Sequence, residues 1–266
     1  MAITPGIMWG QPLSPPVWYG EELDPAGLMN LLARMGLRSI DIFARHVAAY
    51  GVPELREALG ESGLTCSCFY IQGDLLAEGD ERAEVDDNFA RGIEAAREIG
   101  APVVFTHGTQ HTREGDEALA AYIDVLRERN EQVRKAEMTL VIENAGRLVR
   151  TPEHLLTILD ALGDDGLCVC PDMGNFSIWG VDELDALRRL LPWTAHVHLK
   201  DLHPDYVGNE HGRGVPEILG QGVTPIAGVI ELLQAQEWEG AAVWEPGPHD
   251  EAGITAGVAE LLRLVG

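Results

Sequence analysis

The stretch that decides the fold is Thr139 to Gly146, with the sequence TLVIENAG. Four apolar or β-branched residues lead directly into an acid, Glu143, and an amide, Asn144, before a turn. A short apolar run of this kind is typical of a strand in a parallel sheet, because both faces of such a strand are buried. A carboxylate has little structural use where the strand ends, and α/β proteins place their functional groups at the C-terminal ends of parallel strands. The stretch therefore predicts a parallel α/β protein with a functional site at this strand end.

The same arrangement occurs three more times downstream. Asp172 follows the apolar run of LCVCPDMGNF, His198 lies within AHVHLKD, and Glu245 ends the run of AAVWEPG. Each of these side chains lies at the end of a predicted strand. Two glutamates, an aspartate and a histidine at equivalent places predict one common site.

Predicted strands and helices alternate eight times along the chain. Apolar runs predict strands at 6–10, 37–43, 64–71, 102–107, the run ending at Glu143, 167–170, 194–200 and 241–245. Helical spacing and N-cap or Pro signals predict helices at 24–36, from about 53, 82–99, 114–136, 151–162, 182–191, from 224 and 253–264. Within 266 residues and without a linker, this order predicts a single (β/α)8 TIM barrel over residues 1–266. An open doubly wound sheet is the alternative.

Composition excludes several classes of partner. The formal net charge is -24, from 43 acidic and 19 basic residues, which argues against nucleic acid, since binding phosphates needs a basic face. No apolar run reaches the roughly 18 to 20 residues of a membrane span, and no signal peptide precedes the first strand, so we expect no membrane and a cytoplasmic location. The four cysteines form two C-x-C pairs, Cys66/Cys68 and Cys168/Cys170. Residues two apart on a strand share a face, so we expect each pair to pack as small apolar side chains.

The four polar strand ends form a candidate metal site. In a closed barrel the last four strands lie side by side, so Glu143, Asp172, His198 and Glu245 can converge at one mouth. Singly, each acid could cap a helix and the histidine could belong to the core. Three carboxylates and one imidazole suit a hard or borderline divalent ion such as Mn²⁺, Mg²⁺ or Co²⁺. Ligand type by itself does not name the ion, and Zn²⁺ is also possible.

These motifs resemble the xylose isomerase-like barrel superfamily of sugar phosphate isomerases and epimerases, which includes D-tagatose 3-epimerase, hydroxypyruvate isomerase and inosose dehydratase. The matching motifs are ENAG at Glu143, PDMGN at Asp172, HVHLKD at His198, LGQG at Leu219 and WEPG at Glu245; the first half of the chain matches in βα rhythm. The resemblance implies that the four strand-end residues bind one divalent metal, Mn²⁺ as first choice. It also implies that the glutamates move protons on opposite faces of a small sugar or polyol. Barrels of this family often pair, which makes a homo-oligomer possible.

We therefore expect a sugar or polyol isomerase or epimerase that abstracts a proton to give a metal-stabilised enediolate. Glu143 and Glu245 are the predicted bases. Asn175 stands where several epimerases of the family have a histidine that holds substrate, and Val149 stands where they have a glutamate. An inosose dehydratase-like lyase acting on a keto-polyol through the same intermediate is the alternative.

Five further residues are candidates for binding substrate. His107 ends the fourth strand and could bond a substrate hydroxyl, and Lys200 shares the face of His198 and could touch a substrate oxygen or pair with an acid. Asn175 lies one helical turn beyond Asp172. Trp9 could stack on a sugar ring, and Arg213 could pair with a carboxylate or phosphate.

Two other functions fit the barrel less well. An endonuclease IV-like nuclease would need three zinc ions and more histidines, and the acidic surface would repel DNA. A non-catalytic sugar-binding barrel would have no need for two facing glutamates. One metal per chain would exclude the first, and activity unchanged by metal removal would favour the second.

Overall fold

A sheet of eight parallel strands forms the centre of the computed structural model, which describes residues 3–10, 17–18, 21–22, 24–208, 214–247 and 250–266. The strands are β1 (Thr4–Met8), β4 (Ser39–Phe43), β5 (Thr65–Gly73), β6 (Val103–Gly108), β7 (Thr139–Glu143), β8 (Cys168–Cys170), β9 (His196–Leu199) and β10 (Ala241–Trp244). They pair in the order β8-β7-β6-β5-β4-β1-β10-β9. Isolated parallel bridges, Val169 with Thr194 and Asp172 with His198, join the two ends of this order. The predicted (β/α)8 barrel is confirmed.

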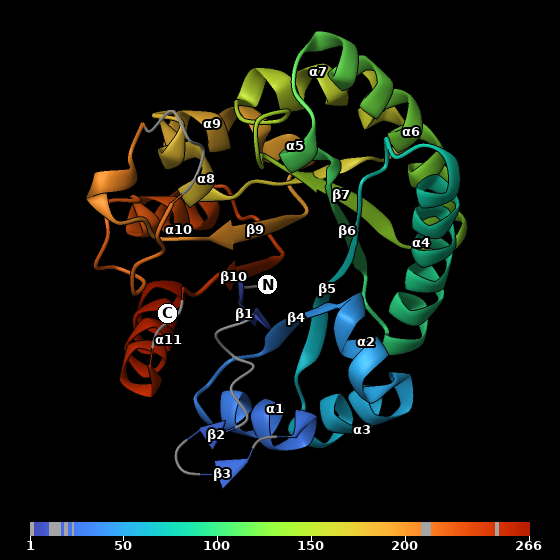
Figure 1. Ribbon diagram of the computed structural model, residues 1–266. Helices are drawn as coiled ribbons and strands as arrows, with labels where there is room; N and C mark the ends of the chain where they lie inside the picture. The colour runs from blue at the N-terminus through green and yellow to red at the C-terminus, as the bar shows by residue number, and fades with distance from the viewer. Residues whose placement is uncertain (1–2, 11–16, 19–20, 23, 209–213, 248–249) are drawn as a thin grey trace.

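Helices surround the sheet on its outer side (Figure 1). The α-helices are α1 (Pro25–Arg34), α2 (Ala44–Tyr50), α3 (Val52–Ser62), α4 (Gly79–Ile99), α5 (Thr109–Thr112), α6 (Asp116–Lys135), α7 (Pro152–Leu162), α8 (Met173–Ile178), α9 (Glu183–Leu190), α10 (Ile226–Ala235) and α11 (Glu251–Val265). Short 3-10 turns cover Gly163–Asp165, Leu191–Trp193 and Pro204–Tyr206. Within the described ranges, none of these helices combines the length and the apolar character that crossing a membrane requires.

The sequence did not predict the short elements. Helices α2, α5 and α8 and the antiparallel pair β2 (Val17–Trp18) and β3 (Glu21–Glu22) fall where a loop or a single helix was expected. One or two helical turns contain too few residues to show a period, and their stability comes from caps and packing. In α8, for example, the Asp172 side chain caps the first turn by accepting from the N–H of Asn175 at 2.8 Å.

Alternation along the strands decides which side chains face the barrel interior. The interior holds an apolar cluster of Met8, Phe43, Cys68, Tyr70, Val103, Phe105, Val141, Cys170 and Val243. Their neighbours, such as Ile142 and Ala242, pack outward against the helices. Since successive side chains of a strand point to opposite faces, Glu143 and Glu245, two positions beyond Val141 and Val243, face the interior at its mouth.

A register shift in the first half of the barrel corrects one expectation. Ile40 pairs with Cys66 but Asp41 pairs with Cys68, so Ser67 is an extra residue on β5. Because this bulge reverses the alternation, Cys66 packs in the outer cluster and Cys68 in the inner one. The prediction that these two cysteines share a face is therefore wrong. Cys168 and Cys170 both pack with the inner cluster, as expected, and all four thiols are free.

A substitution at Gly146, which ends the ENAG motif, tests how closely the mouth of the barrel is packed. Gly146 has a positive φ of 62°, and an added Cβ would overlap the backbone oxygen of Gln110. Gly63, at the end of α3, has a φ of 73° with open space around its Cα, so it is a matched control. We expect Gly63→Ala to lower the free energy of unfolding by about 1–2 kcal/mol, and Gly146→Ala by roughly 1–3 kcal/mol more, because a fixed carbonyl must move. Equal losses in urea titrations of the two variants would contradict this account.

Candidate metal centre

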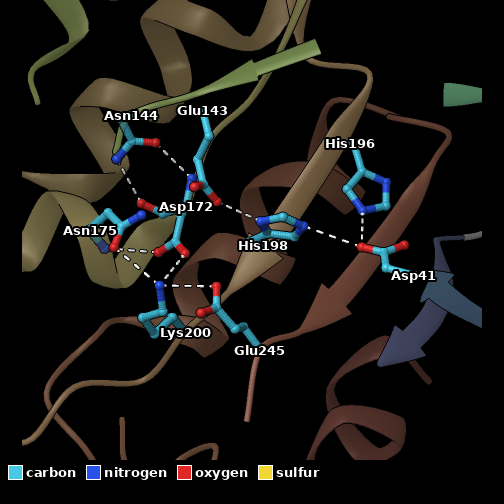
Figure 2. Close-up of polar contacts among 9 residues, drawn as sticks. All are labelled: Asp41, Glu143, Asn144, Asp172, Asn175, His196, His198, Lys200 and Glu245. Atoms are coloured by element: carbon cyan, nitrogen blue, oxygen red, sulfur yellow. Dashed lines mark hydrogen bonds and ion pairs between the residues drawn. The ribbon is translucent and has the colours of Figure 1, made fainter. Parts of the chain in front are cut away.

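Four side chains from four neighbouring strands meet at the C-terminal mouth of the barrel (Figure 2). Glu143 ends β7, Asp172 follows β8, His198 lies in β9 and Glu245 follows β10. One potential ligand atom from each lies within 4.8 Å of all the others. Three of these side chains are buried, and that of Glu245 keeps 26% of its surface exposed. The structure thus brings together the four residues that the strand ends singled out.

Asn144 fixes the backbone on which Asp172 lies. Its side-chain nitrogen donates to the carbonyl of Asp172 at 2.9 Å, and its oxygen accepts the N–H of Asp172 at 2.8 Å. The carboxyl group itself is fully buried. Burial raises the pKa of Asp172 to about 6, although the ammonium of Lys200 opposes the shift. The surroundings of this carboxyl therefore favour its neutral form more than water does.

Lys200 supplies one positive charge inside the site. Its Nζ lies 2.9 Å from Asp172 Oδ2, 2.9 Å from Glu245 Oε2 and 3.1 Å from Asn175 Oδ1 (Figure 2). Burial alone would lower the pKa of Lys200, but Asp172 and Glu245 outweigh burial and hold the pKa above its ordinary value. In this structure Lys200 therefore pairs with acids, one of the two roles expected for it.

His198 lies between two carboxylates. Its Nδ1 is 2.6 Å from Glu143 Oε1, and its Nε2 is 3.2 Å from Oδ2 of Asp41 on β4. Burial alone would lower the pKa of this ring, but Cys170, Asp41 and Glu143 together outweigh burial and hold the pKa well above its ordinary value. The contact with Glu143 aims Nδ1 at the point where the other ligand atoms meet.

The chemistry of these groups fits a divalent cation. In the form that binds a metal, in which the imidazole must give up a proton, three carboxylates and a neutral imidazole carry a formal charge of about -3, which Lys200 reduces to about -2. Carboxylate oxygens with one imidazole nitrogen are a set that Mg²⁺, Mn²⁺ and related ions accept. The residues present therefore suit a divalent metal without selecting Mn²⁺ over its neighbours.

His107 lies in the same mouth, at the end of β6. Its ring stacks with Phe105 at 5.5 Å and contacts Tyr70 edge-on at 5.8 Å, both members of the inner cluster. The side-chain nitrogen of Gln72 lies 3.3 Å from His107 Nε2. An amide nitrogen can only donate, so Nε2 accepts and Nδ1 carries the proton. Burial lowers the pKa of His107 to about 4, so the ring is neutral at pH 7. Within the described part of the chain, Nδ1 is buried without a hydrogen-bond partner.

The remaining substrate candidates are placed differently. Asn175 lies beside Lys200, at the edge of the group of four (Figure 2). Trp9 packs in the outer cluster and stacks on His46 at 4.0 Å, and its contact with a sugar ring stays a prediction. Arg213 lies outside the described residues.

Asp201, which ends the HVHLKD motif, organises the loop that carries LGQG. Its buried carboxylate accepts hydrogen bonds of 2.8–3.0 Å from the backbone N–H groups of Leu202, Gly220, Gly222 and Thr224. A carboxylate that receives several amide donors replaces the water they lose on burial. These hydrogen bonds join the HVHLKD and LGQG motifs into one structural unit, which is separate from the candidate metal ligands.

The sequence analysis missed Asp41 and His196. Asp41 is fully buried in the interior of the barrel, and its Oδ2 lies 2.9 Å from His196 Nε2 as well as near His198. A signal for each was present. Asp41 is a lone acid in the apolar run LRSIDIF, and His196 lies two residues before His198, on the same face. Neither of these two apolar runs indicates by itself that side chains of β4 contact side chains of β9.

A model of the xylose isomerase-like TIM barrel family matches residues 29–264. The chain belongs to this family. Over 149 residues it is 28% identical to D-psicose 3-epimerase from Enterocloster bolteae, an alignment that covers 54% of this chain and 44% of that protein. The chain thus aligns with less than half the length of this curated relative.

Solved structures share the whole fold of the family. The probable 3-DHS dehydratase AsbF from Bacillus anthracis superposes with a TM-score of 0.79 at 15% identity, covering 99% of both chains. A xylose isomerase-like TIM barrel protein from Mycobacterium smegmatis, in complex with magnesium, gives a TM-score of 0.73 at 17% identity, covering 99% of this chain and 96% of that one. At these identities the similarity establishes the barrel.

The raised pKa of Asp172 predicts a specific dependence of stability on pH. A buried acid whose pKa rises from 3.8 to about 6 on folding contributes stability below pH 3.8 and loses it as the pH rises through 6. For the metal-free protein, the stability of Asp172→Asn relative to wild type should increase by roughly 1–3 kcal/mol between about pH 4 and about pH 7, measured by urea unfolding. Asp182→Asn, which changes an exposed N-cap on α9, is the control and should show no such trend. A parallel pH dependence of wild type and Asp172→Asn would contradict the assignment.

Proposed function

We propose that this protein is a divalent-metal-dependent enzyme that isomerises or epimerises a small sugar or polyol by moving a proton next to a carbonyl group. The observation that carries the proposal is the meeting of two glutamates, an aspartate and a histidine at one point of the barrel mouth. The resemblance to a D-psicose 3-epimerase over part of the chain supports the same class of reaction.

Glu143, Asp172, His198 and Glu245 would hold the metal. When bound, a divalent ion polarises a substrate carbonyl and offsets the negative charge that develops on its oxygen. Asn144 and the N-cap of α8 keep Asp172 in place without using the metal. The buried ring of His198 is held in one orientation by carboxylates on both sides.

Glu143 and Glu245 are the groups proposed to move protons. They come from β7 and β10, the outer two of the four strands that supply the site, so they approach the substrate from different sides. One carboxylate takes the proton from the carbon next to the carbonyl, which leaves an enediolate. The other returns a proton to the opposite face of that carbon in epimerisation, or to the neighbouring carbon in isomerisation.

Three further residues are proposed to bind the substrate. The neutral His107 has a buried, unpaired Nδ1–H among the described residues, which suits a hydroxyl oxygen of a sugar. Lys200 and Asn175 lie next to Glu245 and Asp172, where an oxygen of the substrate can share the Lys200 ammonium.

A dehydratase acting on a keto-polyol is the second candidate. The fold of the probable dehydratase AsbF superposes on the whole chain. Asn175 replaces the histidine expected of an epimerase, and Val149 is fully buried in the outer cluster, where it cannot reach substrate. Loss of a β-hydroxyl as water from the same enediolate would give this activity. Product mass separates the two, because only dehydration changes it.

Hydrogen exchange tests the two-base proposal. Wild-type protein with Mn²⁺ is screened against keto-sugars and inososes in D₂O, with mass spectrometry and NMR as the readout. We expect deuterium to enter at one carbon next to the carbonyl, and Glu143→Gln and Glu245→Gln each to slow exchange about 10²–10⁴-fold because a proton acceptor is lost. Glu57→Gln on the outer helix α3 is the control and should exchange normally. Normal exchange in both site variants would refute the proposal.

Metal binding can be tested without any substrate. A ligand that binds only the folded state at 100 times its Kd stabilises the protein by about 2.7 kcal/mol. We expect Mn²⁺ to raise the free energy of unfolding of the chelator-treated protein by this amount, and the gain to disappear in His198→Ala. An equal gain in His198→Ala would place the metal elsewhere. The number of ions per chain, by elemental analysis, should be one.

A further inference from the structure

A buried carboxylate lies directly behind His198, on the side away from Glu143. Asp41 and the two histidines of β9 are all at most 1% exposed. Oδ2 of Asp41 lies 2.9 Å from His196 Nε2 and 3.2 Å from His198 Nε2, and its Oδ1 lies 2.7 Å from the hydroxyl of Ser67 (Figure 2 shows the two histidines). A charged group this deep in a barrel is costly unless it is hydrogen-bonded, and Asp41 has three partners.

The backbone is adapted to this contact. The bulge between β4 and β5 inserts Ser67 opposite Asp41. The Ser67 hydroxyl donates a hydrogen bond to Oδ1 of Asp41, the oxygen that the histidines do not contact. A regular pairing would have placed one fewer inward side chain here. Bulges next to functional sites commonly serve to aim a side chain in this way.

The direction of the hydrogen bonds follows from the chemistry of the acceptor. Oδ2 of Asp41 lies within hydrogen-bond distance of Nε2 of both histidines, and the Ser67 hydroxyl donates to Oδ1. A carboxylate oxygen that lies between two ring nitrogens accepts from both, so Nε2 of each histidine carries the proton. In His198 this leaves Nδ1, which lies 2.6 Å from Glu143 Oε1 without a metal, as the nitrogen that can give up its proton to a metal and offer a lone pair.

We propose that Asp41 is a positioning residue that fixes the tautomer and orientation of His198 so that Nδ1 faces the metal centre. This inference rests on the proposed function, because it assigns His198 as a ligand. Partners of this kind hold metal-binding histidines in place and make the ring a better ligand. Asp41 extends the site from β7–β10 to β4, across the barrel.

The same contact accounts for a second group of potential ligands. Cys170, His196 and His198 also bring ligand atoms within 4.8 Å of one another. Both histidines of this group direct Nε2 to Asp41. A hydrogen-bonded carboxylate, and not a second ion, therefore explains why two imidazoles lie together inside the barrel.

The test compares variants that keep or remove the acceptor. Asp41→Asn keeps the shape and one oxygen acceptor, Asp41→Leu removes both, and Ser67→Ala removes only the bond to the other oxygen. The readouts are the Kd for Mn²⁺ by calorimetry, and the ring N–H signals of His198 and His196 in ¹⁵N NMR of the Mg²⁺-loaded protein. Circular dichroism and thermal unfolding of the metal-free proteins confirm the fold.

We expect Asp41→Leu to raise the Kd for Mn²⁺ about 10–100-fold and to lose the slowly exchanging Nε2–H signal of His198. Asp41→Asn should retain that signal and raise the Kd by about tenfold, since the charge that strengthens the ligand is gone. Ser67→Ala should stay within about threefold of wild type. If Asp41→Leu does not fold, Asp41→Asn decides the question by the same two readouts.

Three outcomes would overturn the proposal. A folded Asp41→Leu, or in its absence Asp41→Asn, that binds Mn²⁺ as tightly as wild type, while His198→Ala weakens binding more than about 100-fold, would show that Asp41 serves packing alone. Two metal ions per chain would assign His196 and Cys170 to a metal instead. Unchanged binding in His198→Ala would remove the metal centre itself, and the proposed function with it.

Discussion

Repulsion among three carboxylates held close together inside the barrel is the constraint on which the rest of the site depends. Ligand atoms of Glu143, Asp172 and Glu245 lie within 4.8 Å of one another. At an effective dielectric constant of about 20, two such charges repel by about 3 kcal/mol. The surrounding residues partly offset this repulsion. Lys200 reaches two of the acids, and His198 contacts the third. A formal charge of about -2 remains, which is why a divalent cation suits the site better than a further lysine would.

The barrel supplies the geometry that makes this concentration of charge possible. Strands β7 to β10 are neighbours around the mouth, and alternation turns one polar side chain from each inward at its end. Neutral or hydrogen-bonded side chains contact the charged side chains and hold them in place. Asn144 fixes Asp172, and Asp41 contacts His198 from across the interior. The four candidate ligands are thus part of a larger layer of buried polar side chains inside the barrel.

In the proposed reaction, specificity would be set by residues other than the four candidate ligands. An enediolate can be reprotonated on either of two carbons or can lose a hydroxyl, and two facing glutamates serve all of these fates. The residues proposed to bind substrate, and so to distinguish these fates, lie around the candidate ligands. His107 presents a neutral donor, and Asn175 and Lys200 border the carboxylates. Val149, at the position where the resemblance to family epimerases predicts a glutamate, is buried in the outer cluster.

The sequence by itself determined the order of strands and helices, the barrel they form, and the four polar strand ends. Each follows from local patterns, since burial on both faces gives apolar runs and function leaves a polar residue where the run stops. Only the tertiary structure decided which side chains meet across the barrel. It paired Asp41 with His196 and His198, shifted the register at Ser67 so that Cys66 and Cys68 face opposite ways, and stacked Trp9 on His46. These contacts join residues up to 157 positions apart, and no local period encodes them because closure and register depend on the packing of the whole sheet.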